Sequence, residues 1–382
     1  MQITPALIRE AVARQRDEMV RVRRWMHENP ELSNLEFNTS AMIAKEIEKL
    51  GLPYKKVSAT GILAELRGAK PGRTIALRAD MDALPMAENA ENLAGGRTCC
   101  SKTPGAMHSC GHDAHVSMLV GAMRALCELR DQLCGTVLFC YEDGEETCIG
   151  RNYRLDRSAG AMVEALKQYP VDGCWAIHVY NALPVGVISV DPGPRMAGIT
   201  EFEIEIEGKG GHGSRPDQAK SPIFAAAYAL TNAAGCFVNE VDVTKTVTFG
   251  VGSIHAGSQN NIIPETAVIS GTARYFDEQA GQSAMEAVKR VVDLTAQAHR
   301  CRMTRFEAGS MAASVTDEAC AALARERLRA AFGAERVVSC PPWFASESFN
   351  YYLSQYPGVL AILGIANPEK GSGALHHNPQ FD

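Results

Sequence analysis

The sequence predicts an α/β protein in which a large open-sheet domain is interrupted by a smaller, ferredoxin-like α+β domain. The first indication is that segments 136–141 and 359–365 are apolar on both faces, as strands of a buried parallel sheet are. The second is that segment 200–207 alternates glutamate with apolar residues, as a half-exposed antiparallel strand does. Because the buried pattern returns after the alternating one, we expect a large domain of residues 1–196 and 310–382 and an inserted domain of residues 197–309. The length of 382 residues, 46% of them hydrophobic, is sufficient for two domains.

The large domain is predicted to begin with helices and to continue as alternating strands and helices. Residues 6–50 have helical patterns that are interrupted near Pro30. Strands are expected at 61–66, 74–79, 136–141 and 174–179, and helices at 116–127 and 161–167. Acidic residues follow the second and third of these strands: Asp80, Asp82, Glu145 and Glu146. Ligands of open α/β sheets bind at the carboxyl ends of the strands, so these acidic residues are expected to border one site.

The inserted domain has the element order β-α-β-β-α-β, which is that of a ferredoxin-like fold. Its strands are expected at 200–207, 246–251, 267–275 and 302–307, and its helices at 221–237 and 283–299. We expect the alternating strand 200–207 to leave an edge at which a second copy of the chain could pair.

Composition and charge exclude several classes of function. The chain has 38 basic and 44 acidic residues, a net charge of −6, and no long basic run, which argues against nucleic acid as the main partner. The twelve cysteines resemble buried small hydrophobic residues more than a disulfide framework, which suggests a reducing compartment. No signal-peptide core and no membrane-length apolar segment is evident, so a cytoplasmic enzyme is expected.

The stretch Gly105–His115 holds three histidines, a cysteine and an aspartate, and the chemistry of the chain is organised around it. Cys110 and His112 offer a soft and a borderline ligand from one short loop, a combination that suits zinc or a similar metal. A buried cysteine alone is usually inert. Further residues of metal-binding type, however, lie on loops or strand ends of the large domain: Glu145, Glu146, His178, His376 and His377. Together these residue types suit a site for two metal ions.

Three motifs of this sequence resemble those of a dinuclear metallohydrolase family. The motifs are Leu77–Pro85, Met107–His115 and Gly208–His212, and the likeness runs from about His27 to Pro379. The family includes bacterial N-acyl-amino-acid amidohydrolases, hippurate hydrolase and plant indole-acetyl-amino-acid hydrolases. The resemblance implies two divalent metal ions, zinc or manganese, with the ligands Cys110 (bridging), His112, Glu146, His178 and His377. His377 is chosen over His376 because the family motif reads His-x-Pro and only His377 has proline two places on.

The same resemblance implies roles for five other residues. Glu145 is the general base that takes a proton from the attacking water, and Asp82 steadies a ligand or the site. His212 stabilises the oxyanion, while Asn261 and Arg274 hold the substrate's carboxylate. The inserted domains of the family pair two-fold, and each sends its histidine into the partner's active site. For Arg274, an exposed strand residue without a function is an alternative of nearly equal weight.

Gly208–Gly213 also matches the G-x-G-x-x-G pattern of dinucleotide-binding proteins, but its surroundings do not. The preceding strand is half-exposed, helical signals begin only at Ser221, and no acidic residue lies about 20 positions further on, where a ribose would be bound. We therefore reject a dinucleotide site.

The chain departs from the family pattern at two places. Glu142-Asp143-Gly144 stands where the family has Gln-Pro-Ala, and Glu347-Ser348-Phe349 stands where it has Glu-Asp-Phe. The additional carboxylates of the first departure could alter metal affinity or the choice of substrate.

The function expected from the sequence is hydrolysis of the amide bond of N-acyl amino acids by a homodimer. The substrate is a small molecule, and neither nucleic acid nor membrane is an expected partner. A dipeptidase or carboxypeptidase using the same site is the nearest alternative. A metal-bound binding protein without turnover is another, favoured by the altered loop at 142–144 and disfavoured by the intact Glu145.

Overall fold

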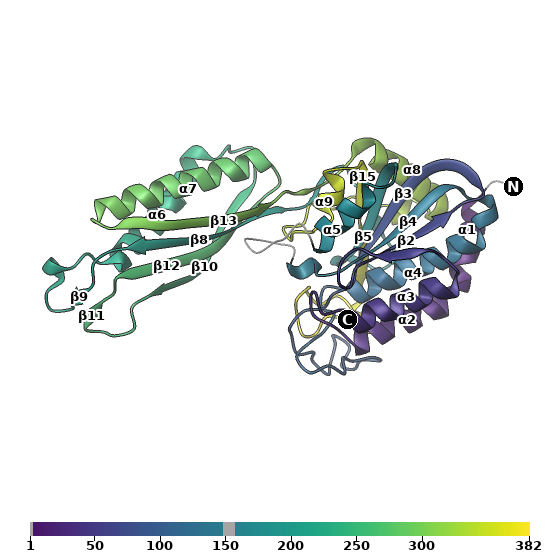
Figure 1. The fold of residues 1–382 in the computed structure, drawn as a ribbon, viewed down its shortest axis with the longest axis horizontal. Helices are drawn as coiled ribbons and strands as arrows, with labels where there is room; N and C mark the ends of the chain where they lie inside the picture. The colour runs from purple at the N-terminus through teal and green to yellow at the C-terminus, as the bar shows by residue number, and fades with distance from the viewer. Residues whose placement is uncertain (1–2, 148–156) are drawn as a thin grey trace.

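The structure is a computed structural model that describes residues 3–147 and 157–382. These residues form two bodies, one built on a sheet of seven strands and the other on a sheet of four (Figure 1). The chain enters the small body at β8 (Gly198–Glu207) and leaves it at β13 (Arg302–Met311). Because Ile199 pairs with Met311, the entry and exit lie side by side. The predicted fold class, an open-sheet domain with an antiparallel insert, is therefore confirmed.

The large sheet has the order β1-β2-β4-β3-β5-β15-β6. Its strands are β1 (Tyr54–Lys56), β2 (Ile62–Arg67), β3 (Lys70–Asp80), β4 (Cys134–Glu142), β5 (Val171–Pro184), β6 (Ile188–Ser189) and β15 (Gly358–Ala366). The four central strands β4, β3, β5 and β15 run parallel, as predicted for the strands that are apolar on both faces. Consecutive strands β2 and β3 are separated by β4, which pairs antiparallel with β2. The carboxyl ends of β3, β4 and β5 consequently meet at one edge of the sheet.

Helices cover both faces of this sheet (Figure 1). They are α1 (Pro5–Arg14), α2 (Arg16–Glu28), α3 (Phe37–Lys49), α4 (His112–Glu128), α5 (Ser158–Leu166), α8 (Glu318–Phe332) and α9 (Asn350–Leu353). Apolar residues of α2, α3 and α4 form one core with β2, β3 and β4, and those of α5 and α9 form another on the opposite face. The helical region predicted at 6–50 is thus three helices, separated at Gln15 and by the loop 29–36.

The small sheet has the order β10-β12-β8-β13 and is antiparallel throughout. Its remaining elements are α6 (Pro222–Glu240), β10 (Val247–Ala256), β12 (Thr266–Tyr275) and α7 (Glu278–Ala298). This confirms the predicted β-α-β-β-α-β order. Two short pairs lie outside the sheet: β7 (Gly193–Met196) with β14 (Ser314–Thr316), and β9 (Gly211–His212) with β11 (Ile262–Ile263). The β9–β11 pair lies at the end of the small body that is remote from the large one (Figure 1).

The expectation that strand 200–207 leaves a free edge is wrong. The strand β8 pairs with β12 on one side and with β13 on the other, so it lies inside the sheet. Its apolar residues pack under α6 and α7, while its glutamates lie on the open face, where Glu207 pairs with Arg302. Alternation records that one face of a strand is exposed, and it carries no information about the neighbours within the sheet. Over the described ranges, no helix is both long and apolar enough to cross a membrane.

Candidate metal centre

A cavity of about 280 Å³ opens at the edge of the large sheet where β3, β4 and β5 end. Its lining comes from the loop before α4, the turn after β4, the strands β5, β7 and β12, the segment 343–346 and the tail of the chain. The lining residues are Cys110, Glu145, Glu146, His178, Met196, Arg274, Trp343, Ala345, Ser346, His376 and His377. Four of the five sequence-predicted ligands and the predicted base therefore line this cavity. The fifth ligand, His112, has an atom within 4.8 Å of atoms of Cys110 and His178.

Cys110 and His112 are held by the glycine between them. Gly111 has a φ of +91°, in the left-handed region, and it precedes the first residue of α4. A Cβ atom at this position would lie 2.4 Å from Cγ2 of Val179, so a larger residue does not fit. The turn directs Cys110 toward His178, with 3.6 Å between Sγ and Nε2. One atom each from Cys110, His112 and His178 lie within 4.8 Å of one another, and all three residues are buried.

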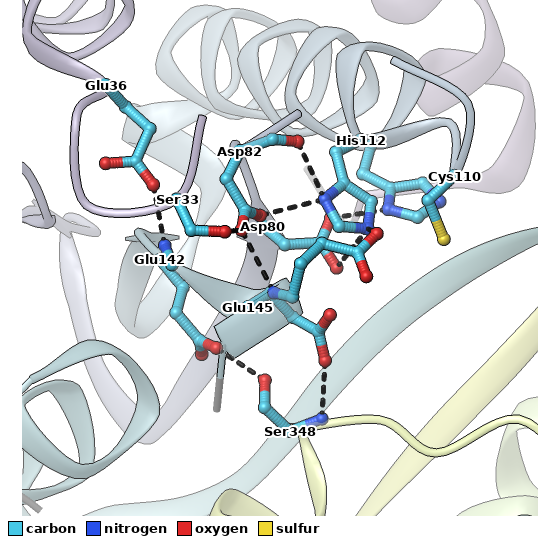
Figure 2. A network of polar contacts seen from close by, with 12 residues as sticks. Ser33, Glu36, Asp80, Asp82, Cys110, His112, Glu142, Glu145 and Ser348 are labelled. Atoms are coloured by element: carbon cyan, nitrogen blue, oxygen red, sulfur yellow. Dashed lines mark hydrogen bonds and ion pairs between the residues drawn. The ribbon is translucent and has the colours of Figure 1, made fainter. Parts of the chain in front are cut away.

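The hydrogen bonds of the two histidines leave the same nitrogen of each ring available. His112 Nδ1 lies 3.0 Å from the Asp82 carboxylate and 3.0 Å from the Asp82 carbonyl oxygen (Figure 2), so it carries the proton and donates. His178 Nδ1 donates to the carbonyl oxygen of Val179 at 2.7 Å. In its neutral form, each ring then has Nε2 as the nitrogen without a proton, which is the arrangement that metal-bound histidines adopt when a second group holds the other nitrogen.

Glu146 and His377 complete a second group with Cys110. Glu146 Oε1 lies 3.5 Å from His377 Nε2 and 3.9 Å from His112 Nε2. His377 has a φ of +55°, unusual for a residue with a side chain, and its amide donates to the carbonyl oxygen of Ser109. The ring of the preceding residue, His376, instead packs against Trp343 and Phe381, with ring centroids 4.7 and 4.8 Å apart. Of the two histidines, His377 is the one with an atom within 4.8 Å of ligand-type atoms of Cys110 and Glu146. Both ring nitrogens of His376 are buried at the same cavity and have no hydrogen-bond partner among the described residues.

The donor set fits bound cations. His112 Nε2 and Glu146 Oε1 are buried, and neither has a hydrogen-bond partner among the residues that the structure describes. Buried polar atoms without a partner are rare in folded proteins and require an explanation. The groups Cys110–His112–His178 and Cys110–Glu146–His377 share the cysteine, so two cations bridged by one thiolate would satisfy both.

A third cluster, formed by Asp80, His112 and His115, is not a metal site by the same test. His115 Nε2 accepts the amide proton of Val179 at 3.0 Å, so Nδ1 carries the proton and donates to Asp80. Neither nitrogen of His115 is available as a ligand. The contact instead fixes the backbone beside His178. Sequence reasoning missed this role, although Asp80 and His115 both lie within the quoted motifs.

Glu145 also lines the cavity. It begins a short 3₁₀ turn (Glu145–Thr147) that follows β4, and its Oε1 accepts the amide proton of Ser348 at 2.9 Å (Figure 2). Burial and the neighbouring carboxylates of Glu347 and Glu146 raise the pKa of Glu145 well above its ordinary value. The turn separates the two adjacent glutamates, so that one faces Ser348 and the other faces the histidines.

The two departures from the family pattern lie in contact with each other. Glu142 is buried, and its Oε1 accepts the hydroxyl proton of Ser348 at 2.5 Å (Figure 2). Asp143 accepts from the hydroxyl groups of Ser58 and Thr60. Within residues 3–147 and 157–382, neither carboxylate belongs to a group of ligand-type atoms at the cavity. The additional negative charges at 142 and 143 therefore bind within the protein and do not enlarge the ligand set.

The three sequence-predicted residues of the inserted domain do not lie together. Arg274, at the base of β12, lines the cavity and donates to the Ser346 hydroxyl at 2.6 Å. Arg274 is half-buried rather than fully exposed, and this burial lowers its pKa. His212 lies on β9 and is exposed, with the backbone of Asn261 bonded to Gly213 beside it. This β9–β11 pair lies at the far end of the small body, remote from the cavity of its own chain (Figure 1).

Comparisons with known proteins agree with this geometry. Residues 76–382 match the family model described as peptidase family M20/M25/M40. Thermostable carboxypeptidase 1 of Saccharolobus solfataricus is 33% identical, over 96% of this chain and 90% of that protein. IAA-amino acid hydrolase ILR1-like 4 of Arabidopsis thaliana is also 33% identical, over 96% of this chain and 81% of that protein. Among solved structures, a Bacillus subtilis protein described as a dinuclear metal binding peptidase from the M20 family has a TM-score of 0.77. It is 29% identical and covers 96% of this chain and 92% of its own.

Proposed function

The chain belongs to peptidase family M20/M25/M40, and we propose that it is a metal-dependent hydrolase that cleaves the amide bond of N-acyl amino acids. The observation that carries the proposal is the pair of ligand groups that share Cys110, together with the buried, unpartnered Nε2 of His112. The resident metals of this proposal are two divalent ions, zinc or manganese, held by Cys110, His112, Glu146, His178 and His377. Thiolate and imidazole ligands favour zinc-like ions over magnesium or calcium.

Two divalent ions held there would make a water molecule acidic near neutral pH and would polarise the amide carbonyl. Glu145 takes the proton of the attacking water and delivers it to the leaving amine nitrogen. The hydrogen bond from the Ser348 amide keeps one oxygen of Glu145 directed away from the histidines. Asp82 fixes the proton of His112 on Nδ1, so that Nε2 remains a ligand.

The remaining groups bind the substrate. Arg274 offers a guanidinium at the cavity wall, where it would pair with the free carboxylate of the amino acid. His212 donates to the oxyanion that forms as water adds to the carbonyl, and Asn261 binds the substrate carboxylate beside it. Since His212 lies on the remote β9 and Asn261 directly precedes β11, we assign them to the active site of a partner subunit in a homodimer. The inserted domain, residues 197–309, would then serve both dimerisation and catalysis.

A peptidase that releases or recognises a C-terminal amino acid is the second candidate. One relative at 33% identity is named a carboxypeptidase and another an amino acid hydrolase, so overall similarity favours neither. A metal-bound protein without turnover is disfavoured, since Glu145 reaches the same space as His112 and Glu146.

The test is a substrate panel with defined metal content. Purified protein is stripped with a chelator, reloaded with zinc or manganese, and assayed by release of free amino acid. N-acetyl and N-benzoyl amino acids are compared with dipeptides that have the same C-terminal residue. We expect at least a tenfold higher kcat/KM, about 1.4 kcal/mol in transition-state binding, for an N-acyl amino acid. Preference for the dipeptides would replace the first proposal by the second, and no turnover with full metal content would contradict both.

A further inference from the structure

A buried polar network lies directly behind Glu145. Its centre is Arg78, whose Nε and Nη2 bind the two oxygens of Glu142 at 3.1 and 2.9 Å. Arg78 also binds Asp80 at 2.6 Å and Glu347 at 3.0 Å. Its Nη2 donates to the Ser348 hydroxyl at 2.7 Å. One guanidinium therefore faces three buried carboxylates, and the side chains of all four charged residues are at most 2% exposed.

Ser348 is the member of this network that also contacts the proposed base. Its hydroxyl lies between Arg78 and Glu142, accepting from the first and donating to the second. Its backbone amide donates to Glu145 Oε1 at 2.9 Å (Figure 2). Two residues earlier, Ser346 accepts from Arg274. The short segment 346–348 thus joins the base and the residue proposed to bind substrate carboxylate to the Arg78 network.

The charge in the network restricts which residue can occupy position 348. A carboxylate there would lie against Glu142 Oε1, at the position now occupied by a hydroxyl at 2.5 Å. Two buried carboxylates in contact cannot both ionise without a large cost, and the network already holds three around one cation. A hydroxyl at 348 is compatible with a carboxylate at 142 because it donates a proton to that carboxylate. The two positions at which the chain departs from the family pattern are therefore complementary.

We propose that Glu142 and Ser348 form one unit that positions Glu145, with the negative charge at position 142 and the neutral hydroxyl at position 348. The unit sets where the amide of Ser348 lies, and that amide holds the carboxylate of the base. This inference rests on the proposed role of Glu145 as the base. Ser348 is a positioning residue, since it acts on the reaction only through Glu145.

The first experiment measures coupling between the two positions by thermal unfolding of the metal-free protein. The variants are Ser348→Asp, Glu142→Gln and the double variant that exchanges the charge. Ser348→Asp alone should lower the unfolding midpoint by about 5 °C or more, because it places a fourth buried carboxylate around the one guanidinium of Arg78. The double variant should recover most of that loss. Ser354, an exposed serine after α9, supplies the matched control, since Ser354→Asp should leave the midpoint unchanged. Additive losses in the double variant would overturn the coupling.

The second experiment separates positioning from stability. Ser348→Ala and Tyr352→Phe each remove one hydroxyl donor to Glu142, which lies 2.7 Å from the Tyr352 oxygen. Only Ser348 also holds Glu145, so Ser348→Ala should lower kcat about tenfold with KM changed less than about twofold. Tyr352→Phe should leave both constants within about twofold of the wild-type values. Metal content, measured on the same samples, should be unchanged in both variants. Equal losses of kcat would overturn the positioning role.

Activity of the charge-exchanged enzyme gives the closing comparison. Ser348→Asp should lower kcat about 100-fold. The double variant with Glu142→Gln should have a kcat at least about tenfold higher than that of Ser348→Asp. If the wild-type enzyme cleaves no N-acyl amino acid and no dipeptide, the proposed function is overturned, and the positioning role with it. If the wild type is active and the double variant is no better than Ser348→Asp, only the inference fails.

Discussion

Asp82 offers the most direct test of how the protein prepares its ligands, because it contacts two of them at once. One carboxylate oxygen lies 3.0 Å from His112 Nδ1, and the other accepts the amide proton of Glu146 at 3.0 Å. The second oxygen also accepts from the Ser33 hydroxyl at 2.6 Å (Figure 2). Every contact of the carboxylate is thus with a donor, which only an ionised carboxylate can satisfy.

Asp82→Asn keeps the shape of the side chain but cannot keep these contacts. If the amide oxygen faces His112, the amide NH₂ must face the donors of Glu146 and Ser33. If the NH₂ faces His112, the ring must move its proton to Nε2, and the nitrogen can then no longer bind a metal. Loss of such a partner typically reduces metal affinity 10–100-fold. Since two ligands are affected, we expect about 100-fold, or about 2.7 kcal/mol.

The measurement is a competition titration of the metal-free enzyme against a chromophoric chelator, with circular dichroism to show that the variant is folded. Ser33→Ala serves as the matched control, because it removes one donor to the same oxygen and leaves both ligands in contact with Asp82. We expect the control to lose about fivefold or less in affinity. A folded Asp82→Asn variant that binds metal as tightly as Ser33→Ala would refute the reasoning.

Four further outcomes are expected. Glu145→Gln should abolish turnover and retain both metals, whereas Glu146→Gln should lose metal as well, by elemental analysis of the purified proteins. Cys110→Ser should weaken metal binding and slow turnover, because an alcohol is a poorer bridging ligand than a thiolate for zinc-like ions. Glu145→Ala and His212→Ala should each be nearly inactive, yet their 1:1 mixture should regain roughly a quarter of wild-type activity after subunit exchange. Half of the randomly formed dimers contain one chain of each variant, and each such dimer has one intact site of two. Finally, burial opposes the charge on His27, but its carboxylate partners raise its pKa to about 9. Protonated His27 therefore contributes stability that is complete below about pH 6.5 and is lost as the pH rises through 9. The midpoint of His27→Gln should accordingly fall less than that of the wild type between pH 7 and 10.

Each of these outcomes has a clear opposite. Equal loss of metal in both glutamate variants would reverse or remove their assignment. Full activity and metal content in Cys110→Ser would make the cysteine structural. Verified subunit exchange without recovery of activity would place His212 outside the partner's site. Parallel pH dependence of wild type and His27→Gln would show that the histidine does not carry the linkage.

The fold was predictable because the pattern of apolar residues records what covers each strand. Strands apolar on both faces became the parallel centre of the large sheet, and the alternating strand became part of an antiparallel one. The position of a strand within its sheet was not predictable in this way. Strand β8 was expected at an edge and lies in the interior, because the side-chain pattern depends on the two faces and backbone pairing depends on the two edges.

Around the candidate site, the ligand-type residues were predictable from the sequence and the residues that orient them were not. Ligand-type residues were recognisable as a group, although not singly, since cysteine, histidine and glutamate at strand ends have few other reasons to gather. The residues that hold them were not. Asp80 and His115 both lie within the quoted motifs. Only the structure shows that both ring nitrogens of His115 are engaged in hydrogen bonds, one with Asp80 and one with Val179. That difference, between a ring with a free nitrogen and one without, decides which histidine can bind metal.

The contact between Glu142 and Ser348 makes the strongest case for reading departures from a motif in pairs. The two residues are 206 positions apart in the sequence. In the sequence they are two separate departures from the family pattern, Glu142 shortly before the Glu145–Glu146 pair and Ser348 shortly after Trp343. In the structure they share one hydrogen bond beside Arg78, so the effect of either substitution depends on the identity of the other residue. A single departure in this network would disturb the proposed base, whereas the combination keeps its charge balance. An altered motif is therefore weak grounds for assigning loss of activity until the partner of each altered residue is known.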